Sequence, residues 1–147
     1  MRMLLKSSMK TVMLFGTFDI LHLGHIDMFL QAKKYGEHLI VVVARDLRVE
    51  QVKGERPVHS EKERAALLSH LDCVDTVVLG DLLDVYQIIA RKKPDVIALG
   101  YDQTCFVDKL SEKIASYGLD SEVVRLLPYK EKKYKSGLIK DSIYSRL

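Results

Sequence analysis

The sequence has few of the residues that mark specialised protein classes. It contains only two cysteines, Cys73 and Cys105, in 147 residues, and neither a CxxC nor an HExxH pattern occurs. That is too little for a disulfide framework and gives no zinc-ligand spacing. No apolar run reaches the ~18 residues of a membrane span, and the apolar part of Met1–Met9 is too short for a signal peptide. We therefore expect a cytoplasmic protein with no membrane partner and no dedicated metal-ligand cluster.

A strong charge of one sign is also missing. Lys and Arg number 23 against 20 for Asp and Glu, which gives a formal net charge of +3. This weak basic balance does not argue for a nucleic-acid partner, but it is compatible with small anionic ligands such as nucleotides. Apolar residues make up 48% of the chain, enough for a sizeable core in a chain with the length of one domain.

Short apolar runs alternate with amphipathic segments along the chain. The apolar runs predict strands over 11–15, 39–44, 74–79, 95–99 and 122–126, and the segments between them predict helices over 24–35, 60–71, 82–92, 106–117 and 136–144. This alternation predicts an α/β fold, a single Rossmann-like doubly wound domain with a five-stranded parallel sheet in the order 3-2-1-4-5. We assign residues 9–147 to this domain and residues 1–8 to an N-terminal extension.

The segment GTFDILHLGH, residues 16–25, follows the first predicted strand, where ligands of such sheets bind. Gly16 lets backbone N–H groups approach a phosphate closely. His22 and His25 are three residues apart and straddle Gly24 at the expected helix start, so both face one side of its first turn. With the free N–H groups of that helix end they form a compact anion site. Such a site suits in-line nucleotidyl transfer, which depends on positioning and charge stabilisation. The alternative is that both are ordinary surface histidines. Two histidines, two glycines and an aspartate within ten residues directly after the first strand disfavour it.

This segment resembles the HxGH signature of the cytidylyltransferase-like superfamily of nucleotidyltransferases. The resemblance implies that His22 and His25 are the catalytic residues and stabilise the phosphates. It further implies nucleotide contacts from seven positions besides His22, namely Thr17, Phe18, Leu23, Gly24, His25, Asp102 and Tyr129. A turn aspartate is the alternative reading of Asp102. A divalent cation, Mg²⁺ in the first place, is expected on the triphosphate, and no protein ligand for it is identified.

Further phosphate contacts are expected from basic and hydroxyl side chains outside the motif. Residues 45–58 predict a mobile basic loop that closes over the triphosphate, with Arg45, Lys53 and Arg56 as candidates and a plain solvated loop as the alternative. Arg64 is similar to the arginine that follows this loop in the family, and an ion pair on the helix surface is an equal alternative. Ser136 matches a hydroxyl-rich turn of the family, whereas Gly137 departs from it.

The choice of substrates is predicted from two further stretches. Residues 41–46 (VVVARD) and 92–103 (KKPDVIALGYDQ) resemble archaeal-type FAD synthases. That resemblance implies ATP as the donor, FMN as the phosphorylated acceptor, and FAD and pyrophosphate as products. Two alternatives remain open: a glycerol-3-phosphate cytidylyltransferase that uses CTP, and a nucleotide-binding module without turnover. Members of the superfamily are often homodimers, but the chain carries no interface signal of its own.

Overall fold

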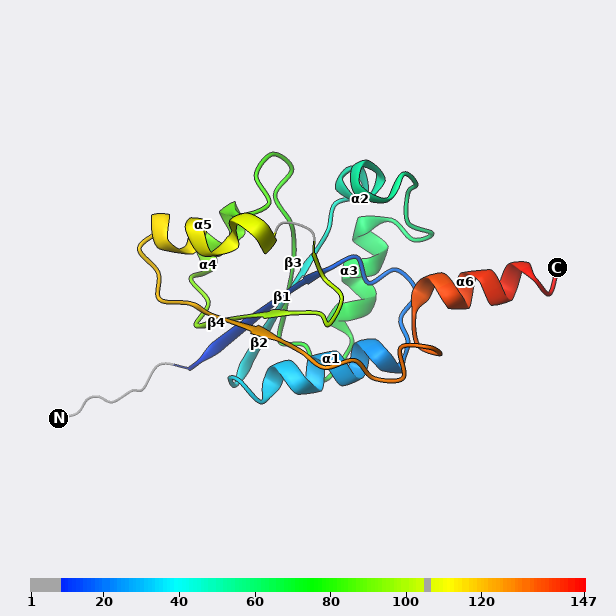
Figure 1. Ribbon diagram of the computed structural model, residues 1–147, viewed down its shortest axis with the longest axis horizontal. Helices are drawn as coiled ribbons and strands as arrows, with labels where there is room; N and C mark the ends of the chain where they lie inside the picture. The colour runs from blue at the N-terminus through cyan, green and yellow to red at the C-terminus, as the bar shows by residue number, and fades with distance from the viewer. Residues whose placement is uncertain (1–8, 105–106) are drawn as a thin grey trace.

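A parallel sheet runs through the computed structural model, which describes residues 9–104 and 107–147 (Figure 1). Its strands are β1 (Thr11–Gly16), β2 (His38–Val43), β3 (Thr76–Leu79), β4 (Val96–Leu99) and β5 (Glu122–Arg125). All four neighbouring pairs are parallel, and the strand order is β3-β2-β1-β4-β5. The predicted fold class and strand order are thereby confirmed, and the order reverses between β1 and β4.

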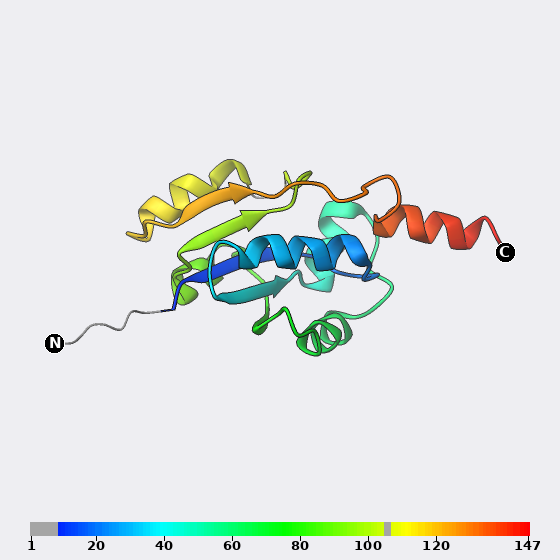
Figure 2. The ribbon, with the colours of Figure 1, turned by 90° about the horizontal axis from the view of Figure 1, so that it is seen from below.

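Helices cover both faces of the sheet. They are α1 (Leu23–Lys33), α2 (Asp46–Lys53), α3 (Glu61–Ser69), α4 (Gln87–Lys92), α5 (Leu110–Ser116), preceded by the 3₁₀ turn η2 (Val107–Lys109), and α6 (Ser136–Tyr144). Side chains of β1 alternate between the faces: Val12 and Leu14 pack with α1 and α3, and Met13 packs with α4 and α5. Figures 1 and 2 both show α6 projecting from the end of the domain opposite the start of β1. Among the described residues, no helix combines the length and apolar character needed to cross a membrane.

Three predicted segments differ from the structure. Part of the expected loop 45–58 is helix α2, which ends at Gly54 with a left-handed φ of 84°. This helix was missed because its sequence is mostly polar and only Val49 is buried. The helix expected over 82–92 begins only at Gln87, after a turn in which Asp84 accepts from the N–H of Tyr86. The helix expected over 106–117 is η2 followed by α5, while residues 1–8, Cys105 and Phe106 lie outside the described residues.

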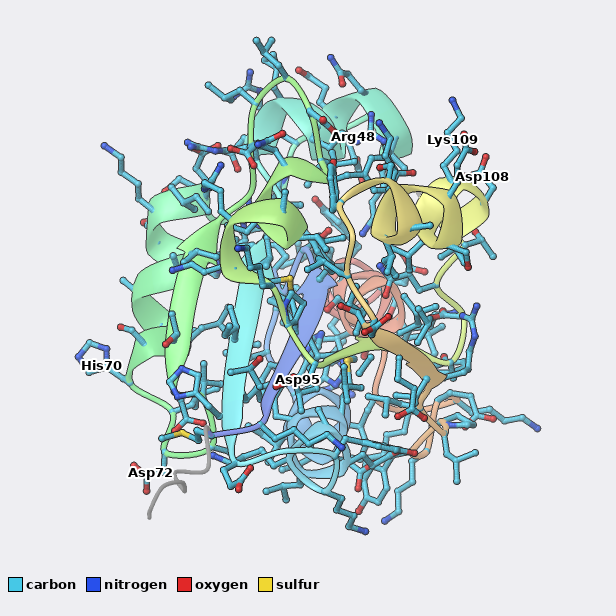
Figure 3. All side chains as sticks on the ribbon, turned by 90° about the vertical axis from the view of Figure 1, so that its left-hand side faces the viewer. Arg48, His70, Asp72, Asp95, Asp108 and Lys109 are labelled. Atoms are coloured by element: carbon cyan, nitrogen blue, oxygen red, sulfur yellow. The ribbon has the colours of Figure 1, made fainter. Side chains whose placement is uncertain are left out.

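Two carboxylates close the amino end of the sheet. Asp95 accepts from the N–H of Thr11 and Asp75 from the N–H of Leu39, both at 2.8 Å, so the starts of β1 and β2 are satisfied by side chains. Figure 3 views the molecule from this end, with Asp95 near the middle, Asp72 at the lower left and Arg48 of α2 at the top. The predicted site residues gather at the opposite end of the sheet, at the carboxyl ends of the strands.

Candidate active site

A cavity of about 590 Å³ lies at the carboxyl ends of the strands. It is bordered by the β1–α1 loop, α2, the turn after β4 and the segment from Leu126 into α6. Eleven of the predicted site residues line it: Thr17, Phe18, His22, Gly24, His25, Arg45, Lys53, Arg56, Asp102, Tyr129 and Ser136. Two do not: Leu23, which is 54% exposed on α1, and Arg64, which is buried.

The two histidines of the motif cap helix α1 reciprocally. His22 is the N-cap residue in an extended conformation, and its Nδ1 accepts from the N–H of Gly24 at 3.1 Å. In return, Nδ1 of His25 accepts from the N–H of His22 at 3.3 Å. The spacing of a capping box is thus built here with two imidazoles, and their ring centroids lie 3.9 Å apart.

These caps determine where each imidazole carries its proton. A backbone N–H that donates to Nδ1 requires a lone pair there, so a neutral ring must hold its hydrogen on Nε2. Both rings therefore offer an Nε2–H donor. Because the two residues line the cavity at the end of β1, this pair is suited to bind the oxygens of a phosphate.

Both histidines have lowered pKa values. Burial lowers the pKa of His22, and burial together with the nearby His22 and Lys53 lowers the pKa of His25 to about 3. At neutral pH the two rings are therefore hydrogen-bond donors rather than imidazolium ions. Positive charge at the site comes from neighbouring side chains such as Lys53, whose Nζ lies 3.4 Å from Oγ1 of Thr17.

Phe18 supports His25 from within the core. Its ring is 4% exposed and lies 5.6 Å from the His25 ring, edge to face, and 5.5 Å from the ring of Phe29. Its backbone has a φ of 55°, a left-handed conformation that costs an aromatic residue of order 1–3 kcal/mol. The ring reaches back over Gly16, so a Cβ at Gly16 would lie 2.6 Å from Phe18 Cζ. The aromatic ring of this predicted nucleotide contact thus packs against His25, one of the two predicted catalytic residues.

Asp19 joins three segments around the cavity. Its carboxylate is 4% exposed and accepts from the N–H groups of Val58 and His59 at 2.7 and 2.9 Å. Nζ of Lys140 on α6 lies 2.8 Å from Oδ2 of the same carboxylate. Burial alone would raise the pKa of Asp19, but Lys140 and these two N–H groups hold it below its usual value. The aspartate of the motif is therefore an anchor for α6 and for the segment after α2.

Two more contacts bring α6 and the residues before it to the motif. Oγ of Ser136 donates to the carbonyl oxygen of Ile20 at 3.0 Å. The ring of Tyr134 lies parallel to that of His22 at 6.0 Å, and Tyr129 lies parallel to Tyr134 at 6.1 Å. Tyr129 and Ser136 were predicted to bind nucleotide or phosphate, and they lie on the same side of the cavity as α6.

Arg64 occupies a different place from either of the two expected. Its side chain is fully buried, and it donates to the carbonyl oxygens of Thr17, Ala44 and His59 and to Oδ1 of Asp46, at 2.6 to 3.0 Å. The expected ion pair on the helix surface is wrong, because the Asp46 pair is in the interior. These bonds instead fix the exits of β1 and β2 relative to α3.

The other basic candidates, Arg45 and Arg56, are both held by ion pairs. Arg45 is tied to Glu61 at 2.7 Å and to the carbonyl of Gly80, and Arg56 pairs with Glu50 at 3.4 Å. After β4, Asp102 pairs with Lys135 at 3.2 Å across the mouth of the cavity. The hydrogen bond that Lys135 donates to Asp102, together with the nearby Tyr101, raises the pKa of Lys135.

Sequence reasoning missed Asp19, Tyr134 and Lys140 as parts of the site. Asp19 lies inside the motif, so its position was a signal, but a buried acceptor and a surface turn look alike in sequence. Lys140 is separated from Asp19 by 121 residues, and nothing local to residues 134–140 indicates their contact with the motif.

The described part of the chain offers no preformed metal site. It contains no group of three or more His, Cys, Asp or Glu side chains arranged to hold a metal ion. Three of the acidic side chains that line the cavity are already paired with cations: Asp19 with Lys140, Asp81 with Arg91 and Asp102 with Lys135.

A family model, curated relatives and a solved structure all match most of this chain. A family model described as cytidylyltransferase-like matches residues 13–142. A protein named FAD synthase from Thermococcus sibiricus is 44% identical over 128 residues, 86% of this chain and 84% of that protein. Another FAD synthase, from Archaeoglobus profundus, is 42% identical over 137 residues, 90% of this chain and 87% of that protein. A solved structure, named a lipopolysaccharide core biosynthesis protein from Thermoplasma volcanium, has a TM-score of 0.78 and 42% identity, over 84% of this chain and 100% of that one.

Proposed function

The chain belongs to the cytidylyltransferase-like family, and on that premise we propose that it is an FMN adenylyltransferase, which transfers AMP from ATP to FMN. The products are FAD and pyrophosphate. The acceptor follows from relatives named FAD synthase, which match at 42–44% identity over most of both chains. The observation that carries the reaction type is the reciprocal cap of His22 and His25, which presents two Nε2–H donors at the end of β1.

The proposed step is an in-line displacement at the α-phosphorus of ATP. A phosphate oxygen of FMN forms the new bond to this phosphorus, and the bond to the β-phosphate oxygen breaks as pyrophosphate leaves with its electron pair. Nε2–H groups of His22 and His25 donate to the phosphate oxygens on which negative charge grows. Lys53, which lies over Thr17, adds positive charge. No covalent intermediate with the enzyme is needed, because positioning and charge stabilisation lower the barrier.

A divalent cation is part of this proposal as a companion of the triphosphate. Mg²⁺ keeps several waters and is commonly held by substrate phosphates with one or two carboxylates. Three of the carboxylates at this cavity are paired with Lys140, Arg91 and Lys135. The cation is therefore assigned to the phosphates of ATP, where it would neutralise charge on the leaving pyrophosphate, and not to a cage of protein side chains.

The two sides of the cavity suit the two substrates. On the β2–β3 side, four valines line it, namely Val42, Val49, Val52 and Val85. An apolar wall of this kind suits a flat flavin ring, with Arg48 nearby for its polar groups. On the β4–β5 side the lining includes the polar side chains of Asp102, Lys135 and Ser136, next to the apolar Leu126 and Leu127. We assign FMN to the first side and ATP to the second, on opposite sides of the histidine pair.

The test is an assay of pyrophosphate release with the purified chain and Mg²⁺. ATP and CTP are each combined with FMN, glycerol 3-phosphate and a sugar 1-phosphate, and the flavin product is identified by chromatography. We expect release with ATP and FMN, with FAD formed in equal amount. Release only with CTP and glycerol 3-phosphate, or only with a sugar phosphate, would show that FMN is not the acceptor. No release with any pair would favour a nucleotide-binding module.

The homodimer expected from the superfamily stays a prediction, and analytical ultracentrifugation of the purified chain checks it.

A further inference from the structure

The turn after β4 is closed by a side chain from the neighbouring strand. The carbonyl oxygen of Gly100 accepts from the N–H of Gln103 at 3.1 Å, and the N–H of Gly100 donates to Oε1 of Gln103 at 3.2 Å. Arg125, the last residue of β5, donates from Nη1 to the carbonyl oxygens of Gly100 and Gln103, at 2.8 and 2.6 Å. One guanidinium therefore holds both ends of the turn that contains Asp102.

Arg125 acts on the cavity without lining it. Asp102, Gly100 and Gln103 are part of the cavity wall, whereas Arg125 is not. Both of its hydrogen bonds go to carbonyl oxygens, and bonds from a charged donor are about twice as strong as neutral ones. The Gly100 carbonyl has two lone pairs, and Gln103 and Arg125 occupy both. A bound nucleotide must therefore be read by other groups of the turn, above all by the carboxylate of Asp102.

We propose that Arg125 is a positioning residue for the nucleoside triphosphate: it holds the turn 100–103 so that Asp102 faces the ribose and base. This inference rests on the proposed function, because it takes the β4–β5 side as the ATP side. Arg125 touches neither the phosphates nor the acceptor. Its loss is therefore expected to weaken ATP binding while the chemical step and FMN binding stay close to normal.

The experiment compares Arg125→Met, which removes both hydrogen bonds, with Arg125→Lys, which keeps a charged donor on a flexible stem. Arg146→Met, at the exposed C-terminal end of the chain, is the matched control. For Arg125→Met we expect the KM for ATP to rise ~10-fold, equivalent to about 1.4 kcal/mol, with kcat and the KM for FMN within about 2-fold. Arg125→Lys should recover part of this loss, and Arg146→Met should match the original chain.

Several results would overturn the inference. One is an unchanged KM for ATP in Arg125→Met. Another is a fall in kcat alone, and a third is an equal rise in the KM for FMN, which would indicate general loosening of the domain. If Arg125→Met fails to fold, Arg125→Lys and Arg125→Gln are compared by the same criteria.

ATP binding measured by calorimetry without FMN separates this inference from the proposed function. If the original chain binds ATP but does not form FAD, the proposed acceptor fails, and the ratio of ATP dissociation constants still decides the role of Arg125. If the original chain does not bind ATP, both proposals are wrong.

Discussion

The backbone N–H of His22 donates to Nδ1 of His25 across the first turn of the helix that His22 itself caps. The bond ties the orientation of the second ring to the backbone of the first. It also leaves Nε2 as the only ring nitrogen of His25 that can carry the proton while the imidazole is neutral. The proposed catalytic geometry and the start of helix α1 are thus specified by the same pair of residues.

Replacement of either histidine tests the assignment of Nε2–H as the active donor. Loss of a transition-state donor in His22→Ala or His25→Ala should lower kcat by ~10²-fold or more. A glutamine amide reaches about as far as Nε2, whereas an asparagine amide reaches only as far as Nδ1. His25→Gln should therefore be ~10-fold faster than His25→Asn, the gain of about one hydrogen bond to a charged group. Steady-state rates on variants of equal melting temperature measure this, and equal rates for the two amides would contradict the assignment.

The lowered pKa of His25 predicts a loss of stability in weak acid. Its ordinary value is 6.5 and its folded value is about 3, so between these limits only the unfolded chain binds the proton. Stability is therefore complete above pH 6.5 and falls as the pH drops, by at most about 1.4 kcal/mol per pH unit. His22 adds to this in the same direction. Urea unfolding between pH 6.5 and 5 measures the slope of the free energy of unfolding against pH. This window lies above the range in which the carboxylates with lowered pKa titrate.

His25→Gln is the control for this slope, because glutamine does not titrate. We expect a flatter dependence in the variant over the same pH window, with the His22 part remaining. A slope identical to that of the original chain would show that His25 is protonated in the folded protein near its ordinary pKa.

Two glycine substitutions of the same kind should have opposite effects. In Gly16→Ala the new methyl group would lie 2.6 Å from Cζ and 2.8 Å from Cε2 of Phe18, a ring already packed against His25 and Phe29. We expect a loss of about 1–3 kcal/mol and a lower kcat, since the support of His25 shifts. Gly137→Ala on α6 meets nothing within 4 Å and should stabilise the helix by up to about 1 kcal/mol. Thermal unfolding and kcat measure both, and similar effects in the two variants would argue against the role of Phe18.

Lys140→Met removes the cation that pairs with the buried carboxylate of Asp19. The two N–H bonds from Val58 and His59 remain, so the core should survive while α6 detaches more readily. We expect faster hydrogen exchange over residues 136–144 and a higher KM for ATP, with exchange in β1 and β2 unchanged. Lys34→Met, at the exposed C-terminal end of α1, is the control. Unchanged exchange in α6 would mean that other contacts hold it.

The sequence predicted the sheet well because burial on both faces leaves a direct trace. Runs such as VVVA after Ile40 and VIAL before Gly100 are apolar throughout, as expected for inner parallel strands. Helix α2 left no such trace, since only Val49 is buried and its polar residues also fit a loop. Its stability comes from tertiary contacts, among them the bonds between Asp46 and Glu61.

The motif was recognisable in the sequence, but the structural role of each residue in and around it was not. The spacing of His22 and His25 indicated an anion site, and the resemblance to the HxGH signature implied their catalytic role. The reciprocal cap gives that spacing a physical reason. Arg64 was misplaced because the sequence cannot show that Thr17, Ala44 and His59 turn their carbonyl groups to one point. Lys140 and Arg125 act on residues remote in the chain, so only the fold shows what they hold.

Helix α6 closes one side of the site although none of its side chains is fully buried. It is held by discrete polar contacts, the Lys140–Asp19 pair and the Ser136–Ile20 bond, and not by the hydrophobic core. Such an element opens at a lower free energy than the whole domain. The sheet can therefore stay folded while α6 detaches and docks again. Substrate can then enter, and a bulky dinucleotide product can leave, without global unfolding.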